Sequence, residues 1–376
     1  MSVVPVIDIS PARRDAAGRR AVADAIGAAN ESVGFLVISG HGVPGELIDD
    51  MYRVTAEFFA LPYEEKLAVR CVRPEESRGY MPPKSRALAY SRGERTPADL
   101  VEFFAAGLPE VPEDDPYYKP ENAGVNFRPN VWPERPARFA EVWTRYYRAM
   151  EGLAQELMRL FALALDLDEH YFDDKIDKHC SNLFANHYPP LETPPEPGQL
   201  RLGAHTDYGS LTLLHQDDAV GGLQVFKDGE WHDVAAIPGT FIVNIGDLMA
   251  RWTNDRWVST LHRVQNPPLH DPGSRRISIP FFCQPNYDAV IEALPTCVSP
   301  ENPAKYPPIT SGRSVRRTCF FIRSTASLPA AILTPACLYA SDTESPPQIR
   351  FCRNPRILSN PHIANPRIRG NPHLAN

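Results

Sequence analysis

Residues 136–165 carry the longest helical pattern in the chain. Apolar side chains recur there every three or four residues, at Phe139, Val142, Tyr146, Met150, Leu153, Leu157, Leu160 and Ala164. This spacing places them on one face of a helix, which we expect to support a core. A shorter stripe at Leu47, Met51, Val54 and Phe58 predicts a second helix over 44–61.

Short apolar runs separated by turn residues fill the region from 178 to 290. The runs are LTLL at 211–214, LQV at 223–225, FIVNI at 241–245 and ISIPFF at 277–282. Gly-Gly, Asp-Gly and Pro-Gly pairs stand between them, which is the chemistry of turns. Short strands in such a series are typical of a sandwich or a jelly roll. We therefore predict a mainly β core with flanking helices, an α+β arrangement.

The first hundred residues predict a mixture of elements. Residues 3–9 and 34–39 have the pattern of short strands, and Ser10-Pro11 is a good start for a helix that runs to about Glu31. Residues 71–100 are polar, contain Pro and Arg, and show little periodicity, so we expect loops there.

Three potential metal ligands lie within the β-rich region. His205 and Asp207 are two residues apart, and His262 follows much later. If 201–216 forms one strand, His205 and Asp207 point to the same side, and His262 reaches them from another strand. Two imidazoles and one carboxylate form the facial triad that suits non-haem Fe(II). The competing interpretation is a surface His beside an Asp in a turn.

Several segments around these residues resemble the Fe(II)/2-oxoglutarate-dependent oxygenases, in the isopenicillin N synthase-like branch. The matching segments are LGAHTDYGSLTLLHQD, GGLQV, FIVNIGDLMARWTNDRWVSTLHRV and RRISIPFF, together with GFLVISGHGVP near the N-terminus. The resemblance implies a double-stranded β-helix (jelly-roll) core. It also implies a dioxygenase that hydroxylates an unactivated C–H of a small molecule, with Fe(II) as cofactor, 2-oxoglutarate and O₂ as co-substrates, and succinate and CO₂ as co-products.

The same resemblance assigns roles to individual residues. It places iron on His205, Asp207 and His262. It places the distal carboxylate of 2-oxoglutarate on Arg276 and Ser278, where an Arg fork and a hydroxyl make a suitable clamp. The segment NHYPP at 186–190 resembles the Asn-x-Tyr-Pro segment of the family, so Tyr188, and secondarily Asn186, are expected to contact the same co-substrate.

These features divide the chain into four parts. We predict an N-terminal α/β region over 1–115, a linker and support helix over 116–177, and the jelly-roll catalytic domain over 178–312. Residues 313–376 differ in composition. They hold nine Arg, no Lys, two acidic residues and eight Pro, and end in imperfect NPRI and NPHIAN repeats. We interpret them as a disordered tail.

The origin of the tail has two explanations. One is a frameshift that replaced the family's C-terminal helix, which resequencing of the locus tests. The other is a basic extension for an acidic partner. Its charge of +7 leaves −14 on residues 1–312, because the whole chain carries −7.

Composition excludes some classes of protein. The acidic chain gives no electrostatic reason to bind nucleic acid, and no apolar run is long enough for a membrane span. Seven cysteines without a C-x-x-C pair favour a reducing cytoplasm. We expect a cytoplasmic protein, with a monomer favoured and a small molecule as partner. The acidic body favours a neutral or cationic substrate, such as a metabolite of antibiotic biosynthesis.

Two alternatives to the dioxygenase remain open at this stage. In isopenicillin N synthase-like oxidases the Arg–Ser pair holds the substrate, and ring closure or desaturation proceeds without 2-oxoglutarate. An inactive or ligand-sensing homologue is the second alternative. In the loop region and just after it, Arg78, Tyr80, Tyr90 and Glu102 are candidate substrate contacts, although a solvated loop explains each of them equally well.

Overall fold

A computed structural model describes residues 2–73, 76–217 and 222–314. The expected disordered tail therefore lies outside the described residues, except for Arg313 and Ser314. Within the described part, no helix is long and apolar enough to cross a membrane.

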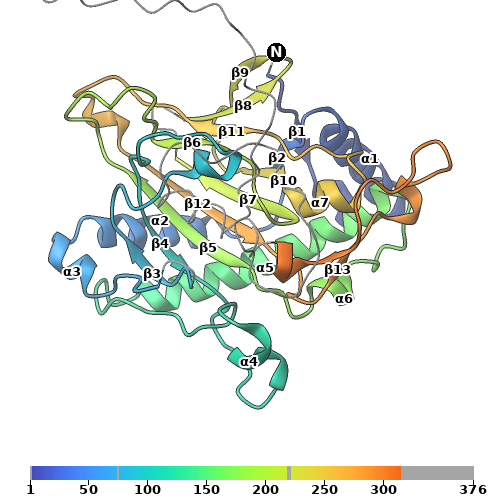
Figure 1. Ribbon diagram of the computed structural model, residues 1–376, viewed down its shortest axis with the longest axis horizontal. Coiled ribbons are helices and arrows are strands. Elements are labelled where there is room, and N and C mark those ends of the chain that lie inside the picture. Colours follow the sequence, from blue (N-terminus) through green and yellow to red (C-terminus); the bar gives the residue numbers. More distant parts are fainter. Residues whose placement is uncertain (1, 74–75, 218–221, 315–376) are drawn as a thin grey trace, which may run out of the picture. The chain divides into compact units, whose positions relative to one another are not determined.

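Two largely antiparallel sheets form the core (Figure 1). The large sheet has eight strands in the order β1-β2-β10-β7-β12-β5-β4-β3, and the small sheet has four in the order β6-β11-β8-β9. Their bounds are β1 Val6–Asp8, β2 Phe35–Ser39, β3 Gly79–Met81, β4 Glu102–Ala106, β5 Asn182–Tyr188, β6 Leu202–His205, β7 Leu211–Gln216, β8 Leu223–Lys227, β9 Glu230–Asp233, β10 Phe241–Ile245, β11 His262–Val264 and β12 Arg276–Cys283. Within the large sheet, only the β1–β2 pair is parallel. A short pair, β13 Val290–Ile291 and β14 Ile309–Thr310, stands apart. This arrangement is the predicted jelly roll with flanking helices.

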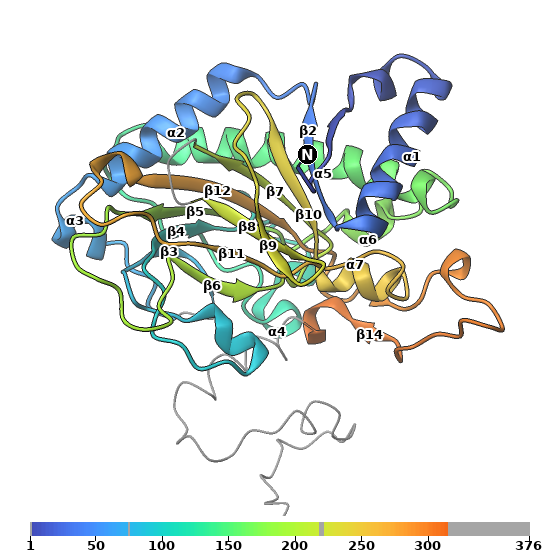
Figure 2. The same ribbon diagram turned by 90° about the horizontal axis from the view of Figure 1, so that it is seen from above.

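Most of the helices pack against the core on one face of the large sheet (Figure 2). They are α1 Ala16–Ser32, α2 Gly45–Phe59, α3 Tyr63–Leu67, α5 Phe139–Ala164, α6 Asp173–Ile176 and α7 Asp247–Trp252. The short helix α4, Pro120–Ala123, packs in a separate small cluster. The apolar stripe predicted over 136–165 is buried as expected: Met150, Leu157 and Leu160 of α5 are fully covered. The predicted support helix is thereby confirmed.

Alternation along the strands separates two environments. On β12, Ile277, Ile279 and Phe281 belong to the apolar core shared with α5. Arg276 and Ser278 of the same strand point the other way, because side chains alternate between the faces of a sheet. We call this second face the inner face, and the face toward α5 the outer face.

Some predictions about local structure were wrong. The helix expected from Ser10 to Glu31 is broken: a 3₁₀ turn spans Ser10–Arg13, and α1 begins after Asp15, whose carboxylate accepts a hydrogen bond from the Gly18 amide. The region expected to be only loops contains β3 and a 3₁₀ turn, η2 (Leu88–Arg92), and β4 follows it. The strand β4 pairs with both β3 and β5, and these are long-range contacts that local periodicity does not reveal.

Candidate active site

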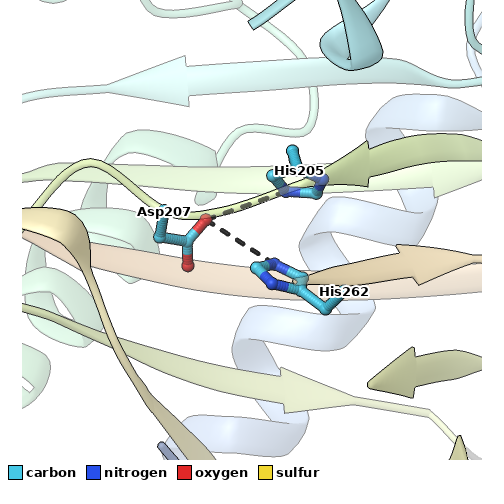
Figure 3. A group of neighbouring side chains, drawn as sticks. All are labelled: His205, Asp207 and His262. Atoms are coloured by element: carbon cyan, nitrogen blue, oxygen red, sulfur yellow. Dashed lines mark ion pairs between the residues drawn. The ribbon is translucent and has the colours of Figure 1, made fainter. Parts of the chain in front are cut away.

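The three potential metal ligands meet between the two sheets. His205 is the last residue of β6 and His262 the first of β11, and the two face each other in the antiparallel ladder. Asp207 follows in the turn between β6 and β7. The expectation of one strand over 201–216 was therefore wrong, since the chain turns after His205. This turn brings the Asp207 carboxylate to the histidines (Figure 3). The alternation of side chains along one strand, which we expected, is not the cause.

The geometry of the triad is compact. Nε2 of His205 and Nε2 of His262 each lie 3.7 Å from Oδ1 of Asp207. The potential ligand atoms all lie within 4.8 Å of one another, and this is the only such His/Cys/Asp/Glu group among the described residues. All three side chains are buried, with 6–7% of their surface exposed. One ion can therefore contact all three.

Backbone carbonyls orient both imidazoles. Nδ1 of His205 lies 2.8 Å from the Gly203 carbonyl oxygen, and Nδ1 of His262 lies 3.0 Å from that of Thr260. A carbonyl oxygen only accepts, so each Nδ1 carries a hydrogen, and Nε2 is the ring nitrogen turned toward Asp207. Burial and the neighbouring His262 lower the pKa of His205 to about 3, so its imidazole stays neutral, as a metal ligand requires.

The carboxylate of Asp207 is held in the same way. Its Oδ2 accepts hydrogen bonds from Oγ1 of Thr212 at 2.6 Å and from Nδ2 of Asn244 at 2.7 Å. Burial opposes ionisation, but the two imidazoles and these two donors outweigh it and lower the pKa of Asp207. Oδ1 is left for a metal. Two imidazoles and one ionised carboxylate are a donor set that fits Fe(II).

A second cluster lies on the inner face of the large sheet beside the triad. Arg276 pairs across the ladder with Tyr188, and Ser278 pairs with Asn186. Residues directly opposite in an antiparallel ladder share a face, so these four side chains line one patch. All are buried, with between 1% and 5% of their surface exposed. The Arg276 guanidinium also lies over the Tyr188 ring, 5.1 Å from its centroid.

This cluster contains buried donors without an acceptor. Nη2 of Arg276 donates to Oε1 of Gln216 at 2.6 Å, but Nε and Nη1 are buried without a hydrogen-bond partner. A buried N–H without a partner is costly, so such groups in native proteins are usually satisfied by a ligand or water. A carboxylate placed against Arg276 supplies an acceptor for one of these atoms, which fits 2-oxoglutarate.

Sequence reasoning missed three residues of this region. Thr212, Asn244 and Gln216 support the site, and all lie on inner-face positions of β7 and β10. A signal was present for two of them, because Thr212 and Asn244 are polar residues inside the apolar runs LTLL at 211–214 and FIVNI at 241–245.

The structure excludes most of the other candidates from the site. Tyr80 and Glu102 hydrogen-bond to each other on the outer face, and Arg78 is buried against the Arg128 and Asn126 carbonyls and the Asn182 side chain. His41, in the GFLVISGHGVP segment, contacts the Gly239 carbonyl. We therefore assign these side chains a structural role.

Two cavities of about 300 and 390 Å³ occur elsewhere. They share Glu151, Asp177 and His179 beside α5, and none of the triad lines either of them. The chemistry of the inner face, and not cavity size, locates the candidate site.

Comparison with known proteins agrees with this geometry. Residues 179–285 match the 2OG-Fe(II) oxygenase superfamily, and residues 4–135 match the N-terminal region named for the non-haem dioxygenase in morphine synthesis. The 2-oxoglutarate-Fe(II) type oxidoreductase hxnY of Emericella nidulans is 37% identical over 319 residues, covering 83% of this chain and 88% of its own. A homoarginine-6-hydroxylase of Arabidopsis thaliana is 33% identical over 315 residues, covering 78% and 88%.

A solved structure shares the fold. The crystal structure of a full-length Neurospora crassa protein in complex with alpha-KG and thymine superposes with a TM-score of 0.73 at 32% identity, covering 85% of this chain and 99% of that one. The cofactors expected from the sequence, Fe(II), 2-oxoglutarate and O₂, are therefore confirmed at the level of the family. The relatives favour the dioxygenase over the oxidase and sensor alternatives. This chain belongs to the 2-oxoglutarate- and Fe(II)-dependent oxygenases and is an enzyme that acts on a small molecule.

Proposed function

We propose that His205, Asp207 and His262 hold the iron of this dioxygenase. We further propose that Arg276 and Ser278 bind the distal carboxylate of 2-oxoglutarate, with Tyr188 and Asn186 beside them. One observation carries the assignment: two imidazoles and one ionised carboxylate converge next to a buried Arg with two unused donors. The reaction is hydroxylation of an unactivated C–H.

The protein's own residues perform binding and orientation. When bound, Fe(II) supplies the oxidative chemistry that consumes O₂ and 2-oxoglutarate and releases succinate and CO₂. The Gly203 and Thr260 carbonyls hold the Nδ1 protons, so the two Nε2 atoms remain donors toward the metal. Thr212 and Asn244 direct Oδ1 of Asp207 to the same point. Burial of all three ligands keeps water away from the reacting centre.

The first test is an anaerobic titration of Fe(II) and 2-oxoglutarate into the purified full chain. We expect a weak visible charge-transfer band that requires both additions and disappears in His205→Ala. His270→Ala is the matched control, because His270 is exposed and its ring faces Glu192, away from the triad. Iron binding without a band contradicts the co-substrate assignment, and a band that survives in His205→Ala contradicts the metal assignment.

The cellular location and the oligomeric state of the protein are also proposals. We infer a cytoplasmic monomer, since Cys71, Cys180, Cys283 and Cys297 are free and buried in the described part of the chain, as is usual under reducing conditions. Light scattering of the purified protein tests the monomer, and a mass of twice 42.0 kDa contradicts it. The four-part division of the chain and a role in antibiotic biosynthesis also stay predictions.

A further inference from the structure

The segment from Arg86 to Asp99 is attached to the strand that carries an iron ligand. Asp99 accepts hydrogen bonds from the Gly203 amide on β6 and from the Leu88 amide, both at 2.9 Å, and its own amide donates to the Arg86 carbonyl at 2.8 Å. Ala89 packs so closely that a Cβ on Gly203 would lie 3.2 Å from it. The Gly203 carbonyl in turn orients His205. The segment therefore has a defined position beside the triad.

The side chain of Arg86 lies over the inner face of the large sheet. Its guanidinium carbon stands 4.0 Å from the centroid of the Phe103 ring. Phe103 pairs across the ladder with Asn186, which pairs with Ser278. Adjacent strands are about 4.8 Å apart, so Arg86 stands roughly two strand spacings from the expected 2-oxoglutarate clamp. It is a second cation on the same face as Arg276.

The guanidinium of Arg86 forms no ion pair within the described part of the protein. Its Nε is buried without a hydrogen-bond partner, and no carboxylate there lies within 4.0 Å of its guanidinium. Asp99 is the nearest acidic group acting on it, but both oxygens of Asp99 are engaged by backbone amides. Burial lowers the pKa of Arg86, and the contact with the Phe103 ring places its guanidinium over the inner face.

Buried apolar side chains continue from Arg86 along the same face. The rings of Phe103 and Phe184 stack with centroids 5.2 Å apart, and both belong to a small core cluster separate from the core on the outer face. Phe184 alternates along β5 with Leu183 and Ala185, which pack against the helices, so its ring lies on the inner face. A cation beside a stacked aromatic pair matches a ligand with an acidic group and an apolar body.

We propose that Arg86 binds the acidic group of the primary substrate, and that this substrate is a small carboxylic acid whose apolar part lies against Phe103 and Phe184. The inference rests on the proposed function, because it assigns the substrate class of the same site. It replaces the expectation of a neutral or cationic substrate. That expectation used the net charge of the chain, whereas Arg276 and Arg86 lie on the inner face beside the triad.

The test uses matched pairs of probes with the full chain. Benzoate, phenylacetate, 3-phenylpropionate and cyclohexanecarboxylate are each compared with their primary amides, and thymine serves as a neutral reference. Binding is measured anaerobically as a perturbation of the charge-transfer band of the Fe(II) and 2-oxoglutarate complex. We expect at least one acid to bind about tenfold or more tightly than its amide, since a charge-assisted pair is the stronger interaction.

Substitutions at Arg86 test whether this residue causes the preference for acids over amides. We expect Arg86→Gln to weaken binding of that acid about tenfold or more and to change amide binding by less than about twofold. Arg86→Lys, which keeps the charge, should retain part of the acid preference. Arg92→Gln is the control, because Arg92 is exposed on the nearby 3₁₀ turn η2 and faces Glu94. A normal band in Arg86→Gln without added acid shows that the variant is folded.

Three results overturn the inference. They are the absence of any acid preference in the wild type, an unchanged preference in Arg86→Gln, or a weakening of 2-oxoglutarate binding in Arg86→Gln as large as that in Arg276→Gln. Calorimetry of the acids without iron or 2-oxoglutarate separates the two proposals. Acid preference there, in a protein that forms no charge-transfer band, contradicts the cofactor assignment and supports the role of Arg86.

Discussion

Two buried polar clusters lie on opposite faces of the large sheet. On the outer face, Glu102 of β4 accepts hydrogen bonds from Lys66 at 2.8 Å, from His187 at 2.7 Å and from the Tyr80 hydroxyl. On the inner face, Arg276 donates once to Gln216 and keeps two buried atoms without a partner. The outer carboxylate is satisfied within the protein, and the inner guanidinium is not.

This difference separates a structural cluster from a binding cluster better than burial does. Glu102 and Arg276 are both almost inaccessible, at 5% and 1% exposure. A buried charge must be paired, and the identity of the partner decides the role. The partners of Glu102 belong to the protein, so Glu102 stabilises the fold, although Nε2 of His187 in that cluster has no partner. The missing partner of Arg276 indicates a ligand.

Removal of the Arg276 charge should have the largest effect on the site. We expect Arg276→Gln to weaken 2-oxoglutarate binding between about tenfold and 100-fold, because hydrogen bonds to a charged group contribute about 1.5–3 kcal/mol. The measurement is the 2-oxoglutarate concentration at half-maximal charge-transfer absorbance. Arg275→Gln is the control, since Arg275 immediately precedes β12. Equal losses in both variants contradict a specific clamp.

Loss of the support for Asp207 should have an intermediate effect. Thr212→Val keeps the shape of the side chain and removes the donor to Oδ2. We expect an approximately tenfold loss of Fe(II) affinity, the lower end of what groups that orient metal ligands contribute. Competition with a chelator measures it. Thr240→Val is the matched control, because the Thr240 hydroxyl bonds the Ile237 carbonyl at the surface. Unchanged iron affinity in Thr212→Val removes Thr212 from the site.

Substitution in the outer cluster should hardly affect the site. Glu102→Gln leaves the buried Lys66 ammonium without its carboxylate, which we expect to cost about 3 kcal/mol of unfolding free energy. Iron and 2-oxoglutarate affinities should change by less than about twofold. Urea unfolding and the band titration measure the two quantities. Glu141→Gln, at an exposed ion pair on α5, should alter neither. A large loss of iron affinity in Glu102→Gln would show that the clusters are coupled.

The cluster around Glu102 on the outer face predicts that the stability of the folded protein depends on pH. Burial opposes ionisation of Glu102, but the hydrogen bonds from His187, Lys66 and Tyr80 outweigh it and hold its pKa below the ordinary value of 4.5. A depressed pKa stabilises the folded protein above 4.5, and this stability is lost as the pH falls through the folded pKa. The difference in unfolding free energy between wild type and Glu102→Gln should therefore shrink on acidification. A difference that grows contradicts the sign.

Local sequence predicted some of these features well. The stripe of α5 and the short strands β7, β10 and β12 follow directly from the spacing of apolar residues, because burial of one face imposes that spacing. The strands β3 and β4 were missed, since their order comes from long-range pairing with each other and with β5. The polar residues Thr212 and Asn244 were visible inside apolar runs. The sequence did not show that both donate hydrogen bonds to Asp207.

The sequence by itself determined which chemical groups the protein contains: two imidazoles, a carboxylate and an Arg–Ser pair, in an order that resembles one family of oxygenases. Only the tertiary structure decided how they meet. The turn after His205 brings Asp207 back, and the register of β5 and β12 sets Tyr188 against Arg276. It also placed Glu102 outside the site and Arg86 beside it. The reason is physical: residue types set the possible interactions, whereas long-range strand pairing sets which face and which neighbour each side chain receives.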